Sequence, residues 1–240
     1  MAVKIPLSLK KSPLISVSCE IRFDGVEQYN DLFATKIAYS ILNEDFSSLT
    51  RLPIVQVPEQ ARANDMPFEP IYGVKRGEAD LLIGPKVIIA RTSAYKGWDN
   101  FCRVILEAWT LSRKYIRKVI RAGFRSVDFF DGRCIDSELN LSLALTQNSS
   151  LETLGKECAS FAVTYVDGNN RVRLSYSNDA KVIDKGKYVK KGSVIDVDAF
   201  CDDPSEEIST VVSELHEIGK RVFFESLKES FVESMEPVYD

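Results

Sequence analysis

The chain has 240 residues, of which 45% are hydrophobic and 28% charged, so its composition is that of an ordinary globular protein. Its apolar runs fall short of the ~20 residues that cross a bilayer, and its first residues lack the apolar core of a secretory signal. We therefore expect a cytoplasmic protein without a membrane partner, built as one large domain or two small ones.

Cysteine and histidine usage argues against a metal centre. Five cysteines are dispersed along the chain without a CxxC pair, at positions 19, 102, 134, 158 and 201. Such an odd set is typical of reduced thiols in a cytosol. Zinc needs clustered Cys and His ligands, and His216 is the one histidine of the sequence, so we expect no zinc site and no cofactor. A Ser-His or Cys-His nucleophile would have to use His216 as its base.

The net charge of −4 is unevenly distributed. Residues 103–133 hold eight basic and three acidic side chains, whereas residues 202–240 hold three basic and eleven acidic ones. This asymmetry predicts a charged partner, or contact between the two segments.

The first elements follow from hydrophobic periodicity. Residues 14–24 alternate strictly between apolar and polar side chains, which predicts a strand with one face in the core and one in water. Residues 29–43 have apolar positions at helical spacing. Four prolines interrupt residues 44–78, where we expect a short edge strand around Val55 and Val57 and a surface loop over 59–69.

A hairpin and a long helix complete the first half. Gly84-Pro85 separates two β-rich runs and predicts a hairpin over 79–94. The apolar stripe that follows predicts a helix over 98–121, ended by Gly123 in a left-handed cap.

The second half repeats this order of elements. We expect a strand over 124–130, a helical segment near 136–146, a hairpin turning at Asp167-Gly168, and a strand over 192–200. The run Asp203-Pro204-Ser205-Glu206 has the residue types of a capping box and predicts the start of a last long helix.

The repeated order predicts an α+β fold of two similar halves, 1–122 and 123–240, with two long amphipathic helices packed on antiparallel sheet. A single continuous domain with a pseudo-twofold axis is the alternative. The order resembles folds in which helices lie on a curved sheet, including the saddle of the TATA-binding protein, a likeness that says little about function.

Five segments together resemble one protein family: SPLISVSCEIRF (12–23), AYKGWDNF (94–101), RAGFRSVDFF (121–130), IDVDAF (195–200) and LHEIGKRVFFE (215–225). They are similar to a sporadically distributed prokaryotic family of hypothetical proteins of about this length, which has Tyr-x-Gly-Trp and Arg-x-Gly-x-Arg motifs. This chain differs from the family pattern at Ser126 and Asp128, where the family has tyrosine and asparagine. The patchy distribution of the family resembles that of toxin–antitoxin and phage-defence genes, and so implies a role of that kind.

Two aromatic side chains are the first candidate binding residues. Tyr95 and Trp98 precede the predicted long helix. They could form a contact surface for a partner or ligand. We favour a second interpretation, in which they anchor the start of the helix on the sheet.

The second candidate group combines basic side chains with one carboxylate: Arg117, Arg121, Arg125 and Asp128. Arg121 and Arg125 could bind a phosphate or carboxylate through bidentate hydrogen bonds, with Arg125 on the strand face opposite Asp128. We favour ion pairs to Asp128, Asp131 or the acidic last helix. A basic stripe at helical spacing over 113–121 leaves nucleic-acid binding open but not favoured, because such stripes are usually solvated helix faces.

Two further candidates carry weaker signals. Asp196 and Asp198 share one face of a predicted strand and could hold Mg²⁺ for phosphoryl chemistry, although no third acidic motif accompanies them. His216, beside the apolar stripe of the last helix, is read as a packing histidine and not as a base.

Because no catalytic constellation is visible, we hypothesise that the protein is not an enzyme. Its expected role is to bind and regulate a protein partner encoded by a neighbouring gene, as an antitoxin-like protein or a component of antiviral defence; homodimerisation is a further option. One alternative is a small-ligand or nucleotide sensor in which Arg125 and Tyr95 read an anionic ligand. The other is a metal-dependent enzyme that acts on phosphodiesters through Asp196 and Asp198.

Overall fold

The computed structural model describes residues 4–42, 49–140, 158–184, 187–205 and 207–239. The first half of the chain contributes β1 (Ser8–Leu9), β2 (Leu14–Gly25), α1 (Asp31–Leu42), β3 (Thr50–Arg51), a 3-10 turn (Pro53–Gln56), α2 (Glu59–Asp65), β4 (Tyr72–Arg76), β5 (Ala79–Gly84), β6 (Val87–Thr92) and α3 (Trp98–Ser112). The second half contributes a 3-10 turn (Arg113–Tyr115), β7 (Ile116–Asp131), a 3-10 turn (Asp136–Glu138), β8 (Ser160–Asp167), β9 (Asn170–Asp184), β10 (Lys187–Asp202), α4 (Ile208–Glu225), α5 (Glu229–Ser234) and β11 (Pro237–Val238).

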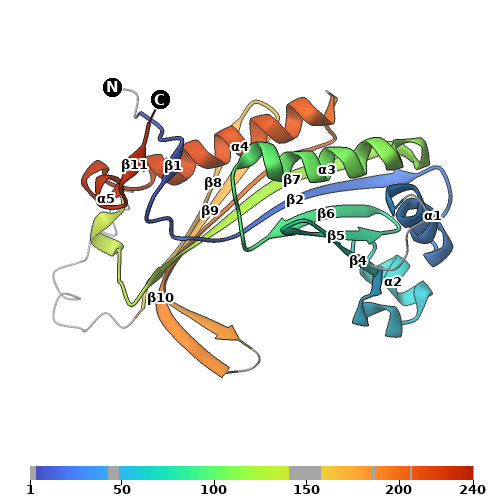
Figure 1. The fold of residues 1–240 in the computed structure, drawn as a ribbon, viewed down its shortest axis with the longest axis horizontal. Coiled ribbons are helices and arrows are strands. Elements are labelled where there is room, and N and C mark those ends of the chain that lie inside the picture. The colour runs from blue at the N-terminus through green and yellow to red at the C-terminus, as the bar shows by residue number, and fades with distance from the viewer. Residues whose placement is uncertain (1–3, 43–48, 141–157, 185–186, 206, 240) are drawn as a thin grey trace.

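One antiparallel sheet of nine described strands, in the order β3-β4-β5-β6-β2-β7-β10-β9-β8, organises the molecule. The helices α3 and α4 lie above the sheet in Figure 1, and α1 packs against α3 and β5 at the right end of the same core. The small strands β1 and β11 pair with each other near the two chain ends. The α+β class expected from the sequence is therefore confirmed.

The strand order is symmetric about the central pair β2–β7. From β2 outward the sheet reads β2-β6-β5-β4, and from β7 outward it reads β7-β10-β9-β8. In each half a long central strand is followed by a three-stranded meander and a long helix, α3 or α4. The boundary predicted at residue 122 falls inside β7, so a single sheet runs through both halves.

The alternating strands bury one face under the helices. Val17, Cys19, Ile21 and Phe23 of β2 are all buried, as the period-two pattern requires. The α1 side chains Phe33, Ile37 and Ile41 are buried with them, and Ile105 of α3 and Leu215 of α4 extend the same core.

The predicted helix over 98–121 was wrong beyond Ser112. Residues 113–115 form a 3-10 turn and β7 begins at Ile116, so Gly123 lies in mid-strand and caps no helix. The apolar residues Ile116, Val119 and Ile120 fit a helical period, but they are β-branched and suit a strand equally well. Pairing with β2 decides between the two structures, and the basic residues of 113–121 therefore do not form a helical stripe.

The connection between α1 and β4 also differs from expectation. Residues 53–56 form a 3-10 turn instead of an edge strand, and part of the predicted 59–69 loop is the helix α2. Arg62 of α2 is almost fully buried; it donates to the Val57 carbonyl at 2.9 Å and to Asp31 Oδ2 at 2.8 Å. This ion pair joins α2 to the start of α1, a contact that no local pattern predicts.

The last helix starts later than its predicted cap. Asp203 has φ of 52°, its N–H donates to the Ile120 carbonyl, and its carboxylate lies 2.8 Å from Lys118 Nζ. The helix begins at Ile208 after Glu207, which makes no side-chain capping bond, and Glu206 lies outside the described residues. Of the helical segment predicted near 136–146, residues 136–138 are a 3-10 turn, and 141–146 also lie outside the described residues.

The central strand offers a direct test of the burial pattern. Ile21 is fully buried, and its neighbours across the ladder are Ala122 and Ile88. We expect Ile21→Ala to lower the free energy of unfolding by about 2–5 kcal/mol, because it removes buried methyl groups and leaves a cavity. Ile15→Ala in the same strand, at a side chain that is 41% exposed, should cost about 1 kcal/mol or less. Urea denaturation measures both, and equal losses would contradict the burial assigned to Ile21 within this strand.

Candidate functional site

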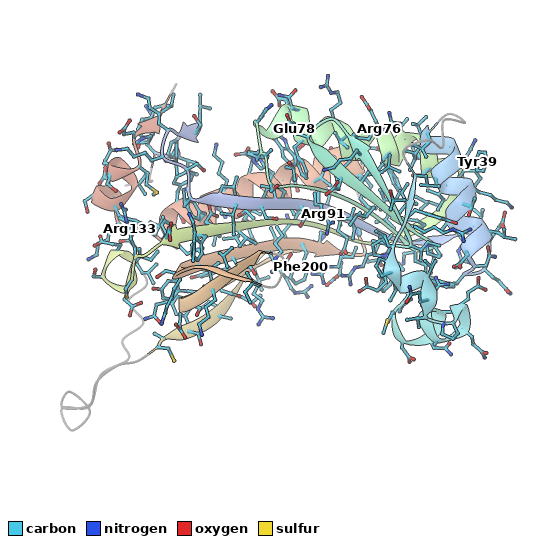
Figure 2. All side chains as sticks on the ribbon, turned by 60° about the horizontal axis from the view of Figure 1, so that its bottom comes forward. Tyr39, Arg76, Glu78, Arg91, Arg133 and Phe200 are labelled. Carbon is cyan, nitrogen blue, oxygen red and sulfur yellow. The ribbon has the colours of Figure 1, made fainter. Side chains whose placement is uncertain are left out.

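The sheet face opposite α1, α3 and α4 is the candidate functional site, here called the open face. In Figure 1 the helices α3 and α4 lie on the other side of the sheet, both ends of the sheet bend away from them, and α2 lies below β4 at one edge. Figure 2 brings this side forward and places Arg91 and Phe200 over the sheet. The open face is therefore a concave, solvent-accessible surface formed by backbone that the ladders hold rigid.

A row of polar side chains crosses the open face at right angles to the strands. Residues paired directly across neighbouring strands point to the same face of a sheet. Following the pairs from β4 to β8 gives what we call the polar row: Lys75, Asp80, Arg91, Ser18, Arg125, Asp198, Arg173 and Thr164. It crosses eight consecutive strands, so positions distant in the sequence form one surface.

Charges along the polar row are paired. Lys75 Nζ lies 2.7 Å and Arg91 Nε 3.5 Å from the Asp80 carboxylate. Arg125 donates two hydrogen bonds to Asp196, with Nε–Oδ1 and Nη2–Oδ2 distances of 2.8 and 2.5 Å. These hydrogen bonds raise the pKa of the Arg125 guanidinium, whereas partial burial raises the pKa of Asp198 against the opposing effect of Arg121 and Arg125. The bidentate pair is thus the most ordered contact of the row.

Beside the polar row, two arginines face each other across the central pair of strands. Arg22 of β2 and Arg121 of β7 are direct cross-strand partners. Arg22 Nε lies 2.6 Å from Glu20 but donates no hydrogen bond within the described structure, because the contact is badly angled. The Arg121 guanidinium stacks 3.7 Å above the Phe200 ring, and Asp198 lies 3.7 Å away. The two like charges are therefore balanced by carboxylates on the same face, and Arg22 also lies over the Phe68 ring at 4.9 Å.

Tyr95 and Trp98 lie on the helix side of the sheet. The Trp98 ring stacks on His216 with a centroid distance of 4.1 Å and an interplanar angle of 6°, and it meets Phe124 edge-on at 5.5 Å. Tyr95 contacts Phe101 at 6.1 Å. The cluster joins the start of α3 to α4 and β7, which is the geometry of a helix anchor.

Burial controls the ionisation of this cluster. Burial raises the pKa of the Tyr95 hydroxyl, with a smaller contribution from the carboxylate of Glu217. Burial also lowers the pKa of His216, while Glu217, at 3.0 Å from Nδ1, acts in the opposite direction. The fold therefore favours the neutral imidazole of His216.

The structure separates several of the predicted site residues. Tyr95 and Arg125 lie on opposite sides of the sheet, so they cannot both contact one ligand. Arg117 is exposed, with Nη2 3.7 Å from Asp24. Arg121 and Arg125 pair with aspartates of β10, and not with Asp128, Asp131 or the last helix as we had expected.

Asp196 and Asp198 do share one face, next to Arg125 and Arg121. In the described ranges, no group of three or more His, Cys, Asp and Glu side chains is placed to hold a metal ion. The contacts present here are therefore those of ion-paired carboxylates.

Of the polar row, sequence reasoning singled out only Arg125 and Asp198, and it missed the other six members, including Asp80 and Arg91. The signal was present in part, since residues 14–24 already showed which side chains face water. It could not be extended, because the register between separate strands is not visible in local sequence.

Two surface hollows border the helices. One, of about 620 Å³, lies between α4 and the β8–β9 hairpin and is lined by Tyr165, Ile218 and Arg221 among others. The other, of about 490 Å³, lies between α3 and the β4–β5 turn. Neither includes Arg121, Arg125 or another side chain of β7.

Comparisons with known proteins do not assign the site. No protein-family model matches the chain, and no curated protein matches it. Within the described residues, no helix combines the length and the apolar character needed to cross a membrane.

Asp128 is the most perturbed carboxyl group near the site. It pairs across the ladder with the buried Ile195, on the helix side of the sheet. Burial raises its pKa to about 8, and the neighbouring Asp196 acts in the same direction. The native protein therefore holds this carboxyl as the neutral acid at pH 7.

This burial predicts a pH-dependent stability. Between 3.8, the ordinary pKa of aspartate, and about 8, native Asp128 keeps a proton that the unfolded chain has lost, so its contribution to stability falls as the pH rises. Asp128→Asn supplies a neutral side chain at every pH. We expect the stability of the variant relative to wild type to increase from pH 4 to pH 8 and then level off. Urea denaturation across this range tests the sign, and parallel curves would contradict it.

Proposed function

We propose that this protein is a non-enzymatic binding protein that recognises a protein partner through the open face of its sheet. The observation that carries the proposal is the polar row, which presents side chains from eight strands on a rigid surface, on the side of the sheet away from α3 and α4. Polar contacts fixed by a rigid scaffold give an interface specificity and register.

The charge pattern favours a protein over a nucleic acid as the ligand of this face. A nucleic-acid surface needs an excess of cations along the path of the phosphates. On the open face, aspartates of β5 and β10 alternate with the arginines and hold several of them in ion pairs. Such a surface complements a partner of mixed charge, and it would repel a uniform polyanion at every carboxylate.

The same pairing argues for binding over catalysis. Asp196, a candidate for chemistry, accepts both hydrogen bonds of Arg125. A carboxylate engaged in this way is a weaker base than a free one, because the guanidinium charge and two hydrogen bonds stabilise its ionised form. The regulatory role expected from the sequence, antitoxin-like or in antiviral defence, stays a prediction, as does a partner encoded by a neighbouring gene.

Charge reversal on the polar row tests this function. Arg91 and Arg173 are exposed and lie in opposite halves of the row. Arg91→Glu combined with Arg173→Glu should weaken partner binding at least a hundredfold, because it brings like charges together at two separate points of the interface. The matched control, Arg103→Glu with Arg113→Glu, makes the same charge change at exposed positions at α3 and just beyond its end.

The measurement proceeds in two stages. Tagged wild-type, row and control proteins are recovered from cells of the source organism, and proteins lost with the row variant alone are identified by mass spectrometry. The purified pair is then titrated by calorimetry, after thermal unfolding has shown that each variant folds. A partner retained by the row variant, or lost equally with the control, would rule out the open face as its binding surface.

A further inference from the structure

The hairpin of β9 and β10 extends beyond the rest of the sheet. The β8–β9 pairing ends at Ser160↔Ser177 and the β7–β10 pairing ends at Gly192↔Asp131. Beyond these points, β9 and β10 pair with each other and with no other described strand. We call residues 178–184 and 187–191 the ribbon. In Figure 1 it bends away from the sheet, on the side opposite α3 and α4.

Lysines are concentrated on the ribbon. Lys181 of β9 and Lys191 of β10 are exposed and directly opposite each other in the ladder. Like charges in this position destabilise a pair of strands. Asp179 lies 2.5 Å from Lys191 Nζ, and this hydrogen bond, together with the charge of Lys181, lowers the pKa of Asp179. The carboxylate of Asp179 thus offsets only part of the charge of Lys181 and Lys191, and the ribbon retains an excess of positive charge.

Two neighbouring positions add to the ribbon, Lys190 on the face opposite Lys191 and Ile183 on the face of Lys181. Lys190 is exposed on β10, 2.7 Å from Asp131 at the base of the ribbon. Ile183 lies two residues beyond Lys181 in β9 and is 65% exposed. An isolated two-stranded hairpin is marginally stable in water, so an exposed apolar side chain and opposed cations leave the ribbon short of stabilising contacts. Binding to an anionic partner would supply them.

We propose that the ribbon binds duplex DNA by lying in the major groove, with its lysines on the phosphates. The major groove of B-form DNA admits a two-stranded ribbon. Phosphates line both sides of the groove, and both strands of the ribbon carry exposed lysine, Lys181 on β9 and Lys190 and Lys191 on β10. Lysine contacts a phosphate as a point charge and requires no bidentate geometry, so this binding depends little on base sequence.

Two features set DNA apart from other acidic partners. The chain as a whole carries a net charge of −4, so a long polyanion is attracted at the ribbon and repelled elsewhere, which confines it to this projection. Duplex RNA has a deep, narrow major groove that a ribbon cannot enter, and it should bind more weakly than DNA. The ribbon is separate from the polar row, so this proposal does not depend on the proposed function.

The test is fluorescence anisotropy of a labelled mixed-sequence DNA duplex titrated with the full chain at several salt concentrations. Three lysines on phosphates predict a slope of log K against log salt of about −2 to −3, at roughly 0.9 per phosphate. Lys181→Glu with Lys191→Glu should lower the affinity at least tenfold and reduce the slope by about 2. The matched control is Lys36→Glu with Lys96→Glu, at two exposed lysines that are ion-paired away from the ribbon.

The outcomes separate the alternatives. Binding that the ribbon variant loses and the control keeps, with duplex RNA weaker than DNA, supports the proposal. Absence of binding by folded wild-type protein at low salt overturns it. Equal losses of DNA affinity in both variants would show non-specific electrostatic attraction and no binding site on the ribbon. Ribbon-dependent binding of polyglutamate that is tighter than binding of DNA would show that the partner is an acidic protein. Circular dichroism verifies that each variant is folded.

Discussion

The architecture depends on the pairing of β2 with β7. These strands run antiparallel from Leu14↔Asp128 to Gly25↔Ile116, and within the nine-stranded sheet they are the pairing that joins the two halves in the described structure. Their buried faces contribute Cys19, Ile21 and Phe124 to a core that continues under both long helices. Because strand pairing fixes register, this contact also decides which side chains of β7 face water.

The helices α3 and α4 are held over this junction by aromatic packing. Trp98 at the start of α3 stacks on His216 of α4, and Phe124 of β7 lies beneath both rings. Two helices and the central strand are thereby joined at one cluster, which burial keeps uncharged. With the helices fixed on one side, the polar residues of the strands are left facing solvent on the other.

The open face follows from the same constraint. The side chains of the polar row come from eight strands. A change of register in any one strand would therefore break the row. Arg22 and Arg121 lie directly opposite each other on this face, where like charges repel. The nearby carboxylates of Glu20 and Asp198 offset that repulsion.

The sequence alone determined the local elements with strong periodicity. The alternation over 14–24, the turn at Gly84-Pro85 and the turn at Asp167-Gly168 each specify a strand or hairpin through neighbouring residues, and the structure contains all three. The tertiary structure decided what local pattern leaves ambiguous. Residues 116–121 became a strand because β2 offered pairing partners, and α2 formed around the buried ion pair of Arg62 with Asp31. The polar row, too, exists only after eight strands have aligned, because lateral register is set by contacts between residues far apart in the chain.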